Sequence, residues 1–301
     1  MRVLITGATG LIGKEIVTCF HKNNIDVNYL TTSKSKLLKS ENYQGFYWNP
    51  KAKEIDIDCF KEVETIIHLA GATVSKRWTP RYKKEIVSSR LDTTRLLVES
   101  LKKTPNQVKQ VISASAIGIY PDSLLNYYDE TYSEGDTSFL SKVVKEWEQV
   151  VDTFAELNIA VSKIRIGLVL SNQGGALPAI VKPIKFGLGA AFGSCEHWQS
   201  WIHIRDLAKL FLYILINKLE GVYNAVAPNP VSNQEFTRLC SQVLNKPLVM
   251  PNIPKFAMKL ILGDMHTLLY LSQRASSKKI EEAGFDFKFH HLKPALQDLL
   301  K

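Results

Sequence analysis

Short apolar runs alternate with longer amphipathic segments along the first two thirds of the chain. The runs are rich in β-branched residues, which is typical of strands buried on both faces of a parallel sheet. Because parallel strands need long crossover connections, usually helical, the alternation predicts a doubly wound α/β fold. The predicted strands cover 2–6, 25–30, 45–48, 65–71, 108–113, 160–166 and 221–226, and the predicted helices cover 11–20, 59–63, 83–102, 141–157, 207–216, 233–244, 254–262 and 276–283.

The alternation stops after residue 170, where glycine and aromatic residues become frequent. A region of this kind beside a parallel sheet is a candidate substrate lobe, although its aromatic side chains could equally form an ordinary small core. We therefore expect a Rossmann-like cofactor-binding domain over 1–170, to whose sheet residues 201–227 return. A smaller C-terminal substrate lobe is expected from 171–200 and 228–301.

The first predicted strand runs directly into a glycine-rich turn with the spacing G-x-x-G-x-x-G. Without side chains at the three glycines, a pyrophosphate can approach the backbone N–H groups where the following helix begins. The turn therefore predicts a dinucleotide site. The residues expected around the cofactor phosphates are Gly7, Thr9, Gly10, Leu11, Ile12 and Gly13.

The end of the second predicted strand bears on the choice between NAD and NADP. NAD-binding folds usually place Asp or Glu about 20 residues beyond the glycines, where it holds the ribose 2′-hydroxyl. This chain has Thr31, Thr32 and Ser33 there, followed by Lys34. Hydroxyl and ammonium groups, with no acid to repel a 2′-phosphate, favour NADP(H) over NAD(H). The alternative is that the lysines lie on a solvated turn.

Other positions are expected to line the cofactor groove. The fourth strand runs into small residues, over which a cofactor could lie, and an arginine on the helix over 83–102 could reach a phosphate. That arginine could instead form a surface ion pair with Asp92 or Glu99. His68, within the same strand, is interpreted as a core histidine. The groove residues are Leu69, Ala70, Gly71, Arg90 and Val169.

Composition and charge restrict the class of protein. The 301 residues are 45% hydrophobic and 22% charged, which is typical of a folded globular protein. The net charge is +9, but no basic run is interleaved with aromatic residues, so an anionic small molecule is favoured over nucleic acid. Four scattered cysteines, Cys19, Cys59, Cys195 and Cys240, indicate neither a disulfide framework nor a metal site.

The longest apolar stretch, 207–216, contains Lys209 and is too short to span a membrane. No signal-peptide pattern precedes the glycine turn. We therefore expect a cytoplasmic protein with a small-molecule substrate and without a nucleic-acid or membrane partner. The oligomeric state is left open, a homodimer included.

An ordered series of motifs resembles the extended short-chain dehydrogenases/reductases, the NAD-dependent epimerase/dehydratase superfamily, and more narrowly the YfcH-type epimerase-family proteins. The resemblance covers essentially the whole chain, and the ordered series is far more specific than the glycine turn alone. Its motifs start at Thr6 (TGATGLIG), Leu69 (LAG), Lys76 (KRWT), Ser88 (SSRLDTT), Ser113 (SASA), Gly174 (GGA), Gly187 (GLG), Trp201 (WIHIRDL) and Ala227 (APNPV).

The resemblance implies that the Tyr of a Y-x-x-x-K pair moves a proton while nicotinamide carries a hydride. A Lys lowers the pKa of this Tyr, and a Ser binds the reacting oxygen. Ser115 matches the Ser. The Tyr-Lys pair is missing, because its place holds Phe139 and Val143, or Ser138 and Lys142 in a register shifted by one.

Tyr120, five residues after Ser115, is the nearest replacement for the missing Tyr, unless it is a packed aromatic before a turn. Arg77 and Trp78 follow the fourth strand, where a cation and a flat ring could clamp an anionic or planar substrate or simply lie on the surface. In the WIHIRD segment, Asp206 is expected to cap the next helix. The expected substrate contacts are Arg77, Trp78, Trp201 and His203, the last of which could titrate near neutrality.

Two functions are consistent with these residues. The first is an NADP(H)-dependent oxidoreductase or epimerase-like enzyme that acts on a small polar substrate, with Ser115 binding the reacting oxygen and Tyr120 assisting. The second is a sensor or scaffold that binds a dinucleotide and has lost turnover. The missing Tyr-Lys pair favours the second function.

Overall fold

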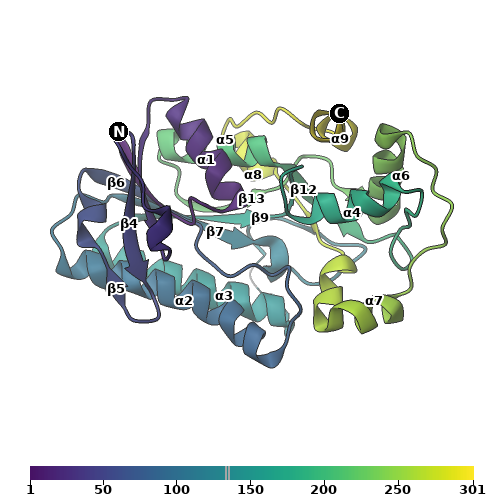
Figure 1. Ribbon diagram of the computed structural model, residues 1–301, viewed down its shortest axis with the longest axis horizontal. Coiled ribbons are helices and arrows are strands. Elements are labelled where there is room, and N and C mark those ends of the chain that lie inside the picture. Colours follow the sequence, from purple (N-terminus) through teal and green to yellow (C-terminus); the bar gives the residue numbers. More distant parts are fainter. Residues whose placement is uncertain (133, 135) are drawn as a thin grey trace.

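A nine-stranded sheet forms the centre of the computed structural model, which describes residues 1–132, 134 and 136–301 (Figure 1). The strand order is β13-β9-β7-β6-β1-β2-β4-β3, and β5 also pairs with β4. From β13 to β4 all neighbours are parallel, whereas β3 and β5 are antiparallel to β4. The chain order reverses between β1 and β6, so the crossovers place helices on both faces. The predicted Rossmann-like, doubly wound fold is confirmed.

The strands of the large sheet and of three small two-stranded sheets are β1 (Arg2–Thr6), β2 (Asp26–Thr31), β3 (Lys39–Ser40), β4 (Tyr43–Asn49), β5 (Glu54–Ile55), β6 (Val63–His68), β7 (Gln110–Ala116), β8 (Tyr127–Tyr128), β9 (Ala160–Ile166), β10 (Leu168–Leu170), β11 (Trp198–Gln199), β12 (Trp201–His203), β13 (Gly221–Ala225), β14 (Val231–Ser232) and β15 (Arg274–Ala275). The α-helices are α1 (Leu11–His21), α2 (Pro80–Lys103), α3 (Phe139–Asp152), α4 (Ala176–Lys185), α5 (Ile204–Asn217), α6 (Asn233–Leu244), α7 (Lys255–Leu262), α8 (Lys278–Glu282) and α9 (Leu292–Leu300). The 3₁₀ helices are η1 (Lys34–Lys36), η2 (Ile57–Phe60), η3 (Ile117–Ile119), η4 (Thr153–Leu157) and η5 (Gly263–Leu269).

Two apolar layers cover the sheet. Because side chains alternate along a strand, Val3 and Ile5 of β1 enter one core, with residues of α1, α5 and α8, whereas Leu4 enters the other. The second core also takes in apolar residues of α2 and α3. Figure 1 shows α1 and α5 on one side of the sheet and α2 and α3 on the other.

A third apolar core belongs to the C-terminal part of the chain. It includes Leu177 of α4, Trp201 of β12, Phe236 of α6 and Leu296 of α9, all of which are nearly inaccessible to solvent. Burial of such large side chains is the main favourable term that holds these helices together. The boundaries of the two domains remain a prediction. Of the segment expected to return to the large sheet, β13 joins that sheet, whereas β12 pairs with β10 outside it.

Two local predictions were wrong. The helix expected over 59–63 is the 3₁₀ helix η2, capped by the Asp56 carboxylate, and Val63 already begins β6. Asp206 was expected to cap the helix α5, but the cap is the His203 side chain, whose Nδ1 accepts from the Arg205 backbone N–H. The Asp206 carboxylate instead accepts from the backbone N–H groups of Lys288 and Phe289. Within the described ranges, no helix is long and apolar enough to cross a membrane.

Candidate functional site

The glycine turn after β1 forms a tight cradle in which each glycine has a different role. Gly7 has φ +75°, a conformation that side chains rarely adopt, and its oxygen accepts from the Gly10 N–H at 3.0 Å. At Gly13, an added Cβ would lie 2.2 Å from the Gly7 oxygen. At Gly10, which is exposed, the same atom would be 3.2 Å from that oxygen. Gly13 therefore allows close packing, while Gly10 leaves the start of α1 open.

The start of α1 is suited to an anion. The first N–H groups of a helix lack partners within the helix, and the helix dipole favours negative charge there. Gly10 stands at the N-cap and offers no side chain to these groups, and the first turn contains no acidic residue. A pyrophosphate fits this arrangement, because the cradle has the room that a Cβ would fill.

A buried hydrogen-bond network fixes the neighbouring strand end. Thr6 Oγ1 accepts from the backbone N–H groups of Leu69 and Ala70 at 3.0 and 3.1 Å, so its own proton goes to His68 Nδ1 at 2.8 Å. His68 Nε2 then donates to Thr94 Oγ1 at 3.0 Å. Burial lowers the pKa of His68 to about 4, so the ring is neutral. His68 is a core histidine, as predicted, and it helps to position the groove.

Arg90 lies beneath the turn that follows β6. Its Nη1 donates to the Ala72 backbone oxygen at 3.2 Å, and an added Cβ at Gly71 would lie 3.3 Å from its side chain. Asp92 approaches Arg95 at 3.9 Å rather than Arg90. Burial lowers the pKa of Arg90 to about 10, which still leaves it charged at neutral pH. The cation thus stands beside the predicted groove.

The carboxyl end of β2 lies next to the glycine turn, since β1 and β2 are paired there. Thr31 is buried and accepts from the Ser33 backbone N–H at 3.2 Å, whereas Thr32 and Lys34 are exposed. The Lys34 ammonium group lies 5.2 Å from the centre of the Tyr47 ring. The residues predicted to receive a 2′-phosphate are therefore gathered at the expected edge of the sheet.

Ser115, on β7, belongs to a closed ionic network. Its hydroxyl donates to Glu148 Oε1 of α3 at 2.5 Å, and Arg165 of β9 donates to both oxygens of Glu148 at 2.9 and 3.0 Å. Glu148 and Arg165 are 7% and 4% exposed. Although burial opposes it, the hydrogen bonds and charge of Glu148 raise the pKa of Arg165, so its guanidinium stays charged.

Tyr120 extends the same network. Its hydroxyl donates to Asn224 Oδ1 at 2.7 Å and accepts from Arg165 Nη1 at 3.1 Å, and the residue is only 1% exposed. Burial raises the pKa of Tyr120 to about 12 in spite of the nearby guanidinium. A substrate does not reach the phenol in this conformation. The catalytic roles of Ser115 and Tyr120 remain predictions. The burial of both side chains and their internal hydrogen bonds argue against these roles.

The place expected for the Tyr-Lys pair is apolar. Ser138 caps α3 by accepting from the Ser141 backbone N–H, so Phe139 begins the helix. The Phe139 and Trp78 rings meet edge to face, with centres 5.2 Å apart, and Val143 packs in the same cluster. Lys142 is exposed. Packing thus occupies the position where the superfamily pattern would place a phenol.

The predicted substrate residues lie in different surroundings. Arg77 is exposed and lies close to Gly263 of η5, whereas Trp78 is 7% exposed and donates to the Val74 oxygen at 2.9 Å. Trp201 and His203 have no exposed surface and belong to the C-terminal part. Their substrate contacts stay predictions, and this burial argues against them.

The titration expected of His203 near neutrality was wrong. Burial lowers its pKa to about 4, in spite of Asp298, whose Oδ2 lies 3.3 Å from His203 Nε2. The ring also stacks on Phe289, with centres 4.1 Å apart. His203 therefore has a structural role, since its neutral ring caps α5 and stacks on Phe289.

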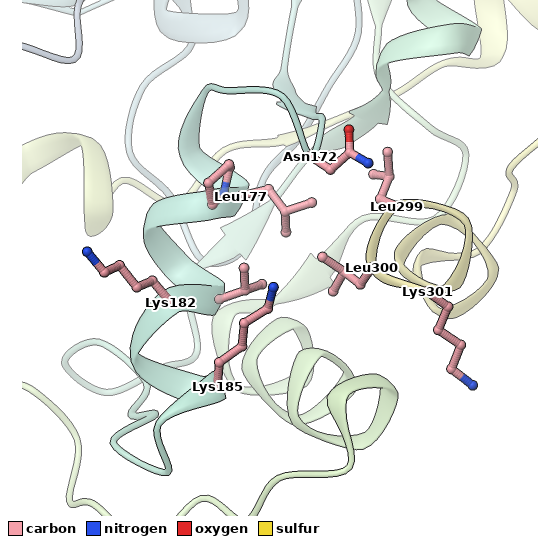
Figure 2. Close-up of a pocket in the computed structure, with 9 residues that line it drawn as sticks. Asn172, Leu177, Lys182, Lys185, Leu299, Leu300 and Lys301 are labelled. Atoms are coloured by element: carbon pink, nitrogen blue, oxygen red, sulfur yellow. The ribbon is translucent and has the colours of Figure 1, made fainter.

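A separate cavity of about 440 Å³ lies between α4 and α9. Buried Leu177, Val181 and Leu299 line it, and Figure 2 shows Lys185 of α4 and Lys301 among the other lining residues. None of the predicted cofactor or substrate residues lines this cavity.

Sequence reasoning missed Glu148, Arg165 and Asn224, although two signals were present. Arg165 stands between two isoleucines of a predicted strand, and Glu148 follows Trp147 on a helix whose buried residues are mostly apolar. A charged residue at a core position indicates a buried partner, because an unpaired buried charge is costly. The two charges were therefore candidates for a pair.

The model of the NAD dependent epimerase/dehydratase family matches residues 3–225, and that of a domain of unknown function (DUF1731) matches 253–299. An epimerase family protein of Staphylococcus aureus strain N315 is 36% identical, with 99% of this chain and 98% of that protein covered.

Solved structures give a matching result. The human epimerase family protein SDR39U1, crystallised with NADPH, has a TM-score of 0.87 and 27% identity over 99% of both chains. The UDP-glucose 4-epimerase of Thermus thermophilus, in complex with NAD, has a TM-score of 0.79 at 18% identity over 99% of this chain and 97% of that one, a likeness of fold. The chain belongs to the NAD-dependent epimerase/dehydratase family and has the fold of its NAD(P)-dependent, epimerase-like enzymes.

Proposed function

We propose that this protein is an NADP(H)-dependent oxidoreductase or epimerase-like enzyme that acts on a small polar substrate in the cytoplasm. The observation that carries the proposal is the open N-terminus of α1 at Gly10, at the point where the strand order reverses. Open α/β sheets bind ligands at this point. The NADPH named with the human relative supports the same cofactor here.

Different residues would hold the pyrophosphate and the 2′-phosphate of the cofactor. The glycine cradle would hold the pyrophosphate through backbone N–H groups, and Thr32, Ser33 and Lys34 would hold the 2′-phosphate. The turn over 69–71 and Arg90 would line the groove on the other side of the cradle, since β6 and β2 flank β1. When bound, the nicotinamide supplies hydride transfer.

On the substrate side, the exposed Arg77 guanidinium beside η5 would attract an anionic group. Trp78 supports this loop by its hydrogen bond to Val74. Ser115 and Tyr120 would act only if the closed network opened when ligand binds.

A cofactor-binding sensor or scaffold is the second candidate. One observation favours it: apolar packing of Phe139 and Val143 occupies the place of the acid/base pair. Such a protein would bind the dinucleotide and respond to it without turnover.

Titration of the purified protein with NADPH and NADH separates these candidates. We expect NADPH to bind at least about tenfold more tightly, and Lys34→Gln to weaken NADPH binding but not NADH binding, since one charge-assisted contact is worth about 1.5 kcal/mol or more. Lys51→Gln, at an exposed lysine in the β4–β5 turn, is the matched control. Oxidation of NADPH across a panel of carbonyl compounds supports the enzyme, and tight binding without oxidation supports the sensor. Failure to bind either dinucleotide refutes both.

A further inference from the structure

Two segments of the C-terminal part contain lysines but no acidic residue. Residues 171–195 carry Lys182 and Lys185, and residues 236–263 carry Lys246, Lys255 and Lys259. All five lysines are exposed, and within the described part of the chain none of them forms an ion pair. The two segments thus carry positive charge and no negative charge of their own.

The backbone joins the two segments. Gly193 donates to the Ile253 oxygen at 2.9 Å, and Ile253 donates to the Ala191 oxygen at 2.8 Å. An added Cβ at Gly189 would lie 2.7 Å from the Leu248 side chain. Figure 1 shows α4, α6 and α7 together at the end of the molecule remote from β4 and β5.

Large apolar side chains project from the same segments. None of the residues of α7 is fully buried, and Phe256, Leu260 and Ile261 of this helix are exposed. We call the joined segments, with these side chains and the five lysines, the basic apolar face. Its most exposed apolar residues are Phe186 (75%), Leu188 (58%), Val249 (69%), Phe256 (70%), Leu260 (77%) and Ile261 (65%).

We propose that the basic apolar face docks the protein on the surface of a membrane that contains anionic lipids. Interfacial segments combine Lys with Phe and Leu, bury the apolar groups at the headgroup boundary and gain attraction from anionic lipids. Protein interfaces, in contrast, are depleted in Lys at their cores. Exposed lysines and exposed apolar side chains in the same joined segments therefore match a lipid surface better than a protein partner.

This binding mode requires no spanning helix, so it is compatible with the lack of one among the described residues. The proposed membrane contact differs from the expectation of no membrane partner, which followed from the short apolar stretch at 207–216. The proposal is independent of the cofactor site, because none of its residues belongs to the glycine cradle.

Co-sedimentation of the full-length protein with vesicles tests the proposal. We expect binding to phosphatidylcholine vesicles that contain phosphatidylglycerol to exceed binding to pure phosphatidylcholine by at least about tenfold, and to fall at high salt. Equal binding to both vesicles, or binding to neither, overturns the proposal.

Variants test whether the basic apolar face is the surface that binds the vesicles. Phe256→Ser with Leu260→Ser and, separately, Lys255→Gln with Lys259→Gln should each lower binding to anionic vesicles at least about fivefold. Leu125→Ser is the matched control, because this side chain is 90% exposed on another segment. Thermal unfolding should be unchanged in all of them. If the serine variant instead turns a dimer into a monomer without vesicles, the face is an interface between copies and the proposal is wrong.

Discussion

Replacement of Gly10 by valine separates the binding role of the glycine turn from its packing role. The backbone at Gly10, with φ −80° and ψ 176°, is extended and suits a β-branched residue, and its Cβ would meet the Gly7 oxygen at 3.2 Å. The cost in stability should therefore stay near 1 kcal/mol. The side chain would stand where a phosphate approaches the first N–H groups of α1. A hydrogen bond to a charged group is worth about 1.5–3 kcal/mol, so losing two weakens the Kd by about 100-fold or more.

Gly13→Ala is the matched comparison. Its Cβ would lie 2.2 Å from the Gly7 oxygen and 2.7 Å from the Ala8 Cα, so the turn and α1 must move apart. We expect this variant to unfold at a clearly lower temperature, whereas Gly10→Val should unfold near the wild-type temperature without binding NADPH. Fluorescence titration with NADPH and thermal unfolding measure the two effects. If Gly10→Val binds NADPH within about threefold of wild type, the glycines serve packing alone and the reasoning is refuted.

Three further predictions concern buried groups. Tyr120→Phe should slow any measured turnover by at least about tenfold if the phenol moves a proton, and an unchanged steady-state rate removes Tyr120 from the mechanism. Glu148→Gln should lower the free energy of unfolding by about 3 kcal/mol or more in urea, because it leaves the Arg165 charge unpaired; a loss below about 1 kcal/mol contradicts a buried ion pair. The pKa of His68 is about 4 in the folded protein and about 6.5 in an unfolded chain, so the unfolded chain binds this proton more tightly. The free energy of unfolding should therefore fall by up to about 3 kcal/mol as the pH drops from 6.5 to about 4. His68→Gln should flatten that pH dependence, and an unchanged curve excludes His68 as its source.

The sequence predicted the sheet and the cofactor cradle because both depend on local patterns. The apolar run of β1 and the glycines after it are neighbours in the chain, and the conformation of Gly7 follows from residue type. Parallel strands then bring Thr31 and the 69–71 turn to the same edge, as doubly wound topology requires. The sequence could therefore predict that the residues expected around a cofactor lie at one edge of the sheet.

The catalytic and substrate residues could not be placed in this way. Whether Ser115 faces a cleft or a helix depends on Glu148, whose carboxylate comes from a different element. Asp206 was expected to cap a helix that begins at 207, but α5 begins at Ile204, so Asp206 lies within its first turn and accepts from the Phe289 backbone N–H instead. Burial of this kind comes from non-local packing, which periodicity along the chain does not encode.

Packing explains why this chain can have the glycine cradle without the Tyr-Lys pair. The cradle uses backbone groups, so it survives changes of side chain elsewhere, whereas the Tyr-Lys pair needs two particular side chains on α3. Val143 is 5% exposed and lies in a cluster with Phe139, Trp78 and Met265 of η5. A lysine at 143 would bring a charge into this apolar cluster, at a cost of several kcal/mol unless it found a partner. Apolar packing in this cluster thus occupies the place where the acid/base pair would stand.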